Sequence, residues 1–345
     1  MSWSALAAGG GGRRAGGAAG RRASAEGGGG RAAGRRAFRR RTGRRRREEL
    51  HGRLLVAPTL LVVGGVVVLP MAAVLVLSVQ DLRLIEIRSL SLSDLGFTLD
   101  NFARVLSGPG FWAAVRTTVA YAVLTTAGSL AAGLVVALAL RRPFPGRGAL
   151  RALMLVPYAL PVVAGTTIWT TLLNPQYGAV NEIGRRFLGW EAPVSFLTLG
   201  EAEVAGVPVP VALCTVVAFE VWKSFPLAFL FITARLQAVP RETEEAAVVD
   251  GASPVQVFRH VLLPQLAGVL GVLAVLRFIW SFQNFNDVYL LTGGAGGTEV
   301  VAVRVYQELA VRADLGTAAA LGVLMALALS LPLAGYLRAV YRGRL

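Results

Sequence analysis

Six stretches of the chain are apolar over about 20 residues or more, the length that a helix needs to cross the roughly 30 Å core of a bilayer. These stretches are residues 54–79, 113–140, 150–173, 208–235, 265–290 and 315–337. Proline interrupts most of them, which a membrane helix tolerates where neighbouring helices satisfy the freed backbone groups. The pattern predicts an all-α polytopic membrane protein, with six bundled transmembrane helices in residues 51–345 and both termini on one side.

Composition supports a membrane protein, because 54% of the residues are hydrophobic and only 16% are charged, against roughly 25% charged in soluble domains. The single cysteine, Cys214, lies in an apolar run, which predicts a small buried side chain. His51 and His260 are the only histidines, so we expect neither a metal site nor a catalytic site. The one lysine, Lys223, follows no glycine-rich loop. ATP hydrolysis through a phosphate-binding loop is therefore excluded for this chain.

The first 50 residues are rich in arginine, glycine and alanine, and 15 of the 34 arginines fall within residues 1–53. Such a segment buries too little apolar surface to fold alone, so we expect a disordered, solvated tail. Contact with anionic membrane lipid or RNA, or a start codon assigned too far upstream, are the alternatives. We expect no nucleic-acid partner for the folded part of the chain.

Arginines near the span ends predict the orientation. The side that includes the tail carries 25 of them and the opposite side 8, or 10 against 8 without the tail. We therefore expect a multi-pass protein of the inner or plasma membrane. Both termini and the segment 241–264 should lie in the cytoplasm. Along the second span, small residues recur at Gly128, Ala132, Gly133 and Ala137, a spacing that lets helix backbones approach closely.

The segment 241–264 is polar and lies between two apolar stretches. Its acidic residues are concentrated at the start, as in a helix N-terminus, and Gly251 can supply the left-handed position at which a helix ends. Ser253, Pro254 and Gln256 then match a capping box, so a second helix should run toward Pro264. A DNA-binding helix-turn-helix is disfavoured, because the outer helix is not basic and both ends join membrane spans.

The spacing Glu245-Ala246-Ala247, three residues, Gly251, nine residues, Val261-Leu262-Leu263-Pro264 resembles the EAA loop of ATP-binding-cassette (ABC) importer permeases. Val261 in place of isoleucine is the one departure. "LVPYALPVVAGTTIW", "NPQYGAVN" and "YLLTGGAGG" are similar to the carbohydrate branch, in particular the maltose-type F permease. The resemblance covers residues 54–345 and implies a type I importer fold and a loop that docks on an ATPase. The coupling residues it implies are Glu245, Ala246, Ala247, Asp250, Gly251, Leu263 and Pro264.

The same resemblance implies the partners: a second homologous permease, two cytoplasmic ATPase subunits that use ATP and Mg²⁺, and an extracellular solute-binding protein that delivers a sugar. No cofactor is expected on this chain. The chain would be a non-catalytic transport subunit that works by alternating access.

Charged residues inside the spans cost roughly 2.5 to 3.5 kcal/mol each on insertion, so Glu220, Lys223 and Arg277 should be functional or paired. Glu220 and Lys223 are three residues apart and can pair with each other, whereas Arg277 has no partner in its own span. Arg277, Trp280, Ser281 and Asn284 share one helix face. An aromatic ring beside hydroxyl and amide groups suits a sugar. The substrate-binding set is therefore predicted as Arg277, Trp280, Ser281, Asn284, Glu220 and Lys223.

Several alternatives remain open from the residues alone. The polar groups of this face could satisfy each other, and Gln283 and Asp287 lie on an adjacent face as weaker candidates. Arg277 leaves open an acidic sugar derivative. The solute could also be a polyamine or a metal chelate, or Glu220 and Asp287 could serve an ion-coupled secondary transporter, although no internal repeat is evident.

Overall fold

A computed structural model describes residues 55–85, 96–204 and 206–342. The predicted tail, residues 1–50, lies outside these residues. By its contacts the chain divides into two units, Met1–Pro70 and Met71–Leu345. The described part of the first unit is the beginning of the uncharged helix Leu55–Ser78, which includes the π-helical segment η1 (Gly64–Val68) and α2 (Leu69–Ser78).

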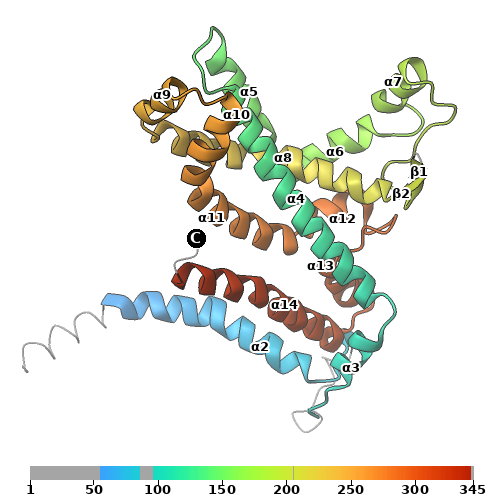
Figure 1. The fold of residues 1–345 in the computed structure, drawn as a ribbon. Helices are drawn as coiled ribbons and strands as arrows, with labels where there is room; N and C mark the ends of the chain where they lie inside the picture. Colours follow the sequence, from blue (N-terminus) through green and yellow to red (C-terminus); the bar gives the residue numbers. More distant parts are fainter. Residues whose placement is uncertain (1–54, 86–95, 205, 343–345) are drawn as a thin grey trace, which may run out of the picture. The chain divides into compact units, whose positions relative to one another are not determined.

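In the described residues, five helices are long and apolar enough to cross a membrane, and the number rises to six if one pair of helices, bent at a short break, counts as one span. The long ones are Leu55–Ser78, α4 (Phe111–Ala139), α8 (Val211–Gln237), Pro254–Phe282 and Leu315–Arg338 of α14 (Leu315–Tyr341). The pair is α5 (Arg147–Ala159) and α6 (Val162–Leu172). The predicted multi-pass helical fold is confirmed, and Figure 1 shows α4 and α8 crossing near the middle of the second unit.

Two predicted spans differ from the structure. Residues 150–173 form two helices that meet at 98°, because Leu160 precedes Pro161 and is extended at ψ 134°, the backbone region that a residue before proline prefers. The stretch 265–290 is not one helix either: it breaks after Phe282 and resumes at Asn286.

The helix before the second break is α11 (Leu263–Phe282), and the short α12 (Asn286–Thr292) follows it. The Asn284 side chain accepts a hydrogen bond from the Asp287 backbone N–H at 3.2 Å. An asparagine that binds nearby backbone in this way favours a helix start over a helix interior.

The small residues of α4 allow it to pack closely on α8. A Cβ atom at Gly133 would lie 2.7 Å from the Ala228 Cβ and 2.8 Å from the Phe229 backbone nitrogen. At Gly128 the nearest atom would be a Val221 methyl carbon at 2.6 Å. The predicted close approach of helix backbones is therefore present, within this chain.

Cys214 of α8 is exposed, so the prediction of a buried side chain is wrong. In a membrane helix an apolar run does not separate core positions from outward-facing ones, because the outer surface is also apolar. Cys214 lies on an outward-facing part of α8.

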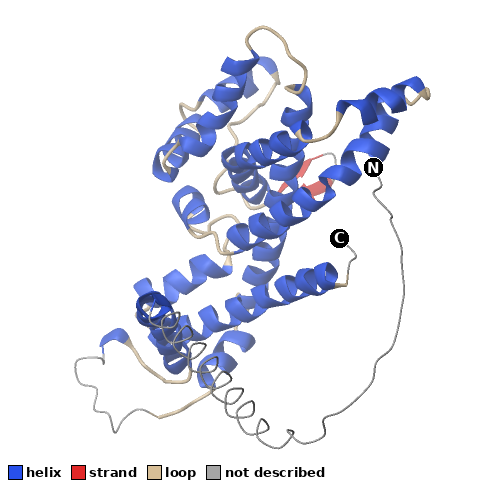
Figure 2. Cartoon of the chain, turned by 90° about the vertical axis from the view of Figure 1, so that its left-hand side faces the viewer, coloured by secondary structure: helices blue, strands red, loops and turns tan. Residues whose placement is uncertain are grey.

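Short elements connect the spans: α3 (Asp100–Ser107), α7 (Ala179–Phe187), α13 (Val301–Tyr306) and the π-helical η5 (Gln307–Val311). Within the described ranges the all-α expectation holds apart from one antiparallel pair, β1 (Ala202–Val204) and β2 (Val207–Val209), in which Ala202 faces Val209. Figure 2 shows these two strands, whereas the other regular elements of the described residues are helices.

On α7, the Glu182 carboxylate accepts hydrogen bonds from Arg185 and Arg186. These bonds lower the pKa of Glu182 below its usual value, and the bond from Arg185 has the larger effect.

Candidate functional site

A cavity of about 580 Å³ opens where both broken helices meet α8. Tyr158 and Leu160 line it from the bend between α5 and α6, and Glu220 and Lys223 line it from α8. Arg277, Trp280 and Asn284 contribute from the end of α11 and the break that follows. We call it the mixed-charge cavity. The two breaks thus place helix ends and side chains around this cavity, as discontinuous helices do in transporter sites.

Four charged side chains form one network in the wall of the mixed-charge cavity. The Arg277 Nη2 donates a hydrogen bond to the Glu220 Oε1 at 2.6 Å, and the Lys223 Nζ lies 3.1 Å from the Glu220 Oε2. Lys223 also forms an ion pair with Asp287. Glu220, Arg277 and Asp287 are buried. Two cations and two carboxylates balance, which is the condition under which charges remain stable away from water.

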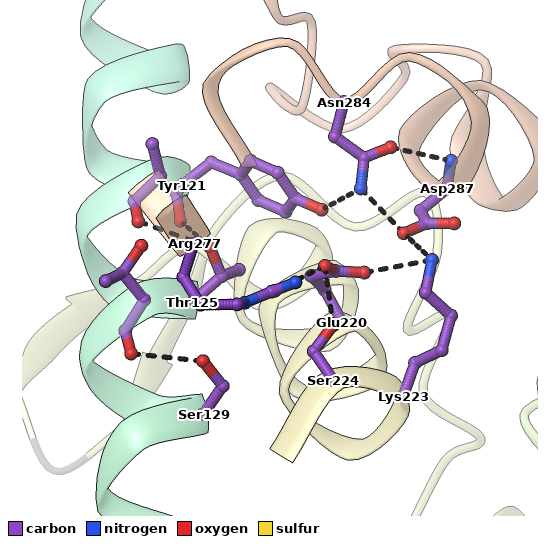
Figure 3. A network of polar contacts seen from close by, with 11 residues as sticks. Tyr121, Thr125, Ser129, Glu220, Lys223, Ser224, Arg277, Asn284 and Asp287 are labelled. Carbon is purple, nitrogen blue, oxygen red and sulfur yellow. Dashed lines mark hydrogen bonds and ion pairs between the residues drawn. The ribbon is translucent and has the colours of Figure 1, made fainter. Parts of the chain in front are cut away.

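Neutral groups extend this network to α4. The Asn284 Nδ2 donates to the Asp287 Oδ2 at 2.6 Å and to the buried Tyr121 hydroxyl at 3.2 Å. The Ser224 hydroxyl donates to the Glu220 Oε1 at 2.8 Å. Figure 3 shows Asn284 bridging Tyr121 and Asp287, with Lys223 between the two carboxylates. The network therefore ties α4, α8, α11 and α12 together.

The structure brings most of the predicted substrate residues to one place. Arg277, Trp280, Asn284, Glu220 and Lys223 all line the mixed-charge cavity. Ser281 is buried without contributing to the lining, and its hydroxyl has no hydrogen-bond partner among the described residues. The predicted pairing of Glu220 with Lys223 is present. Arg277, without a partner in its own span, has Glu220 of α8 as its partner.

Asp287, Gln283 and Tyr158 are among the cavity members that were missed or ranked too low from sequence. Asp287 was a weaker candidate because it was placed on an unbroken helix, whereas the break at Asn284 turns it toward Lys223. Tyr158 was not singled out, although it precedes the Leu160–Pro161 bend. Tyr158 and Trp280 are each 51% exposed, and both line the cavity. The proline after Leu160 was the available signal for Tyr158.

The second candidate region is the loop between α8 and the fifth span. Its first helix is α9 (Arg241–Val249), and Gly251 follows at φ 84°. The Ala252 N–H donates to the Ala247 carbonyl at 2.9 Å, which closes the turn as in a Schellman motif. Glu245, Ala246 and Asp250 are exposed beside this turn.

The predicted capping box is present: the Ser253 N–H donates to Gln256 Oε1 at 2.7 Å, and the Gln256 N–H donates to Ser253 Oγ at 3.4 Å. The second helix is not separate from the fifth span. α10 (Pro254–Gln256), the π-helical η4 (Val257–Leu262) and α11 form one run, Pro254–Phe282. Leu263 and Pro264 lie within it. The wider π turn accommodates Pro264, which lacks a backbone N–H.

The family profile and the relatives that resemble this chain describe components of membrane transporters. The profile of the family described as binding-protein-dependent transport system inner membrane component matches residues 125–344. The inner membrane ABC transporter permease protein YcjO of Escherichia coli K12 is 36% identical over 274 residues, which are 79% of this chain and 88% of YcjO. The trehalose/maltose transport system permease protein MalF of Thermococcus litoralis is 32% identical over 253 residues, or 73% of this chain and 80% of MalF.

A solved bacterial ABC transporter involved in the import of the acidic polysaccharide alginate has the same fold. One of its chains matches at a TM-score of 0.69 with 20% identity, over 89% of this chain and 98% of that chain. The membrane spans, the profile match and the curated relatives lead to one conclusion: the chain belongs to the binding-protein-dependent transport system inner membrane components and is a permease subunit of an ABC importer.

Proposed function

We propose that this permease subunit carries a neutral sugar, and that the mixed-charge cavity is where the sugar binds. The observation that carries the proposal is the combination of exposed aromatic rings, Tyr158 and Trp280, with charges that already balance. Aromatic faces pack on the apolar faces of a sugar ring. For the sugar hydroxyls, Lys223 keeps one N–H donor and the Asn284 Oδ1 keeps one acceptor site. The similarity to a trehalose/maltose permease supports this substrate class.

Charge balance favours a neutral sugar over an acidic one. Arg277 is buried and its Nη2 is already bonded to Glu220, and Lys223 has two carboxylate partners. An anionic substrate would have to displace one of these carboxylates, and a displaced buried carboxylate is costly. By the same argument the cavity has no unpaired charge to bind a polyamine or a metal chelate. Membership of the ABC importer family argues against the alternative of an ion-coupled secondary transporter.

The test is uptake of trehalose and maltose by cells that express the complete importer. Trp280→Ala should lower uptake about tenfold through loss of ring contact, and Trp280→Phe should retain most of it. Trp112→Ala is the matched control, because Trp112 is 56% exposed and lies at the start of α4. Glucuronate should not compete. Normal uptake by Trp280→Ala, at equal amounts in the membrane, would contradict the assignment.

The loop at 241–264 is proposed as the contact with the ATPase partners, which would bind ATP and Mg²⁺ in place of this chain. Three valines at its turn are strongly exposed: Val248 at 61%, Val249 at 85% and Val255 at 72%. Exposed apolar side chains grouped on a rigid, capped turn suit insertion into a protein cleft. A second homologous permease and an extracellular binding protein complete the proposed complex, with this loop and both termini in the cytoplasm.

Gly251 offers a test of this contact. A Cβ atom there would meet nothing within 4 Å, but φ is +84°. Asparagine tolerates that conformation and tryptophan does not. Gly251→Trp should therefore uncouple ATP hydrolysis from uptake in reconstituted vesicles, while Gly251→Asn stays near wild type. Normal coupled uptake by Gly251→Trp would refute the docking proposal and leave the sugar assignment untouched.

A further inference from the structure

A second polar cavity, of about 280 Å³, lies where α4 and α8 end, beside the loop at 241–264. Four arginines line it: Arg141, Arg147, Arg151 and Arg241. Thr233 and Gln237 add a hydroxyl and an amide from α8. We call it the arginine cavity. Its lining contains no acidic residue.

Two of these arginines donate hydrogen bonds to backbone carbonyl groups at the C-terminal end of α4. The Arg151 Nη2 donates to the Leu140 carbonyl at 2.9 Å, and the Arg147 Nη1 donates to the Arg141 carbonyl at 2.9 Å. Cations at a helix C-terminus also complement its partial negative charge. A guanidinium has five N–H donors, so these contacts leave most of the donors available. Helix capping alone does not account for four arginines around one cavity.

The charge of the arginine cavity is largely uncompensated. Glu244 of α9 pairs with Arg141, and no carboxylate among the described residues forms an ion pair with Arg147, Arg151 or Arg241. Two buried polar atoms also lack a hydrogen-bond partner there, the Arg151 Nε and the Thr233 Oγ1. Unused buried donors among like charges favour a bound anion, which would satisfy both.

We propose that the arginine cavity binds a phosphate group, supplied by the headgroup of an anionic phospholipid. Guanidinium groups match phosphate oxygens in geometry as well as charge. The cavity lies where α4 and α8 end and α5 begins, at the boundary of the membrane-spanning segments. Basic pockets between membrane helices at this level recognise anionic headgroups. Free inorganic phosphate presents the same chemistry, so the experiment must separate the two sources.

The cavity also contacts the coupling loop. Arg241 is the first residue of α9, and Arg141 is bonded to Glu244 of the same helix, with the Nη1 to Oε2 distance at 2.7 Å. A phosphate at Arg141 would compete with Glu244. Binding of the headgroup would therefore change how firmly α9 is held against the end of α4.

The experiment is native mass spectrometry of the full-length chain, purified with its complex partners and supplied with phosphatidylglycerol or phosphatidylcholine. We expect preferential retention of phosphatidylglycerol, reduced about tenfold per arginine in Arg147→Gln/Arg241→Gln, since a charge-assisted hydrogen bond is lost each time. Arg142→Gln is the matched control, because Arg142 is exposed and does not line the cavity. Arg241→Gln alone serves if the double variant misfolds, because Arg241 is exposed.

A second arm titrates inorganic phosphate into lipid-depleted protein. Saturable phosphate binding that displaces phosphatidylglycerol, and that weakens in the same variants, supports the shared chemistry at this site. Phosphate binding without retained phosphatidylglycerol would overturn the lipid source. Equal retention of both lipids, or equal phosphatidylglycerol retention by wild type and Arg241→Gln, would overturn the site.

Discussion

The mixed-charge cavity and the arginine cavity both have residues of α5 and α8 in their walls, yet their charges are arranged in opposite ways. In the first, Glu220, Lys223, Arg277 and Asp287 balance each other within hydrogen-bond reach. In the second, one carboxylate faces four arginines. Deep within the spans an unpaired charge is too costly to retain, whereas near the membrane surface water and headgroups can compensate it. Position along the span thus decides which polar arrangement is stable.

Removing Glu220 should have the largest effect on this contrast. Glu220→Ala leaves Arg277 buried without its carboxylate, so we expect a loss of about 3–5 kcal/mol in the free energy of unfolding. Thermal unfolding of the purified complex in detergent measures it. Glu201→Ala, at an exposed site, is the control. The double variant Glu220→Gln/Arg277→Gln should recover part of the loss. Equal stability of Glu220→Ala and the control would contradict the paired network.

Gly133 lies on α4 between Tyr121, which is bonded to the charged network, and Ala137, which lines the arginine cavity, so its replacement should have an intermediate effect. Gly133→Leu places side-chain atoms against the Phe229 backbone, and overpacking of this kind costs about 1–3 kcal/mol. Both cavities should be disturbed, so sugar uptake and lipid retention should fall together. The control is Gly268→Leu, where a Cβ atom meets nothing within 4 Å. If only one of the two readouts changes, the α4–α8 contact does not support both cavities.

Glu244 should have the smallest effect, because its pair with Arg141 is partly exposed. The two side chains are 22% and 26% exposed, and such pairs contribute about 0.2–1 kcal/mol. Glu244→Ala should therefore lower the unfolding temperature only slightly. At about 1 M salt, where the screening length is ~3 Å, the difference from wild type should vanish. If Glu244→Ala lowers the free energy of unfolding as much as Glu220→Ala does, then the difference in burial does not explain the difference between the two cavities.

Much of the architecture could be predicted from the chain of apolar stretches, because membrane spans need length and hydropathy above all. The turn at Gly251 was also predictable, since Gly251 and the Ser253 capping box are local signals. The breaks near Leu160 and Asn284 were not predicted, although each has a local signal: a proline follows Leu160, and Asn284 is itself an asparagine that favours a helix start. A proline inside a span permits either a kink or a break, and packing decides between them.

The candidate site was predictable in its residue types and in the pair within one helix, Glu220 with Lys223, but not in its pairs between helices. Helical spacing placed Arg277, Trp280 and Asn284 on one face, but the partners of these residues come from other helices: Glu220 from α8, and Tyr121 from α4. Spacing along one helix carries no information about contacts between helices. For the same reason the exposure of Cys214 was predicted wrongly.

The sequence by itself determined the membrane class, the family and the helix caps in the loop at 241–264, because each depends on patterns over a few to some tens of neighbouring residues. Only the tertiary structure decided that the intramembrane charges cancel and that two helix breaks open a cavity beside them. It also gathered Arg141, Arg147, Arg151 and Arg241 around one cavity. These features depend on which helices touch, and that is set by the packing of whole helices against one another.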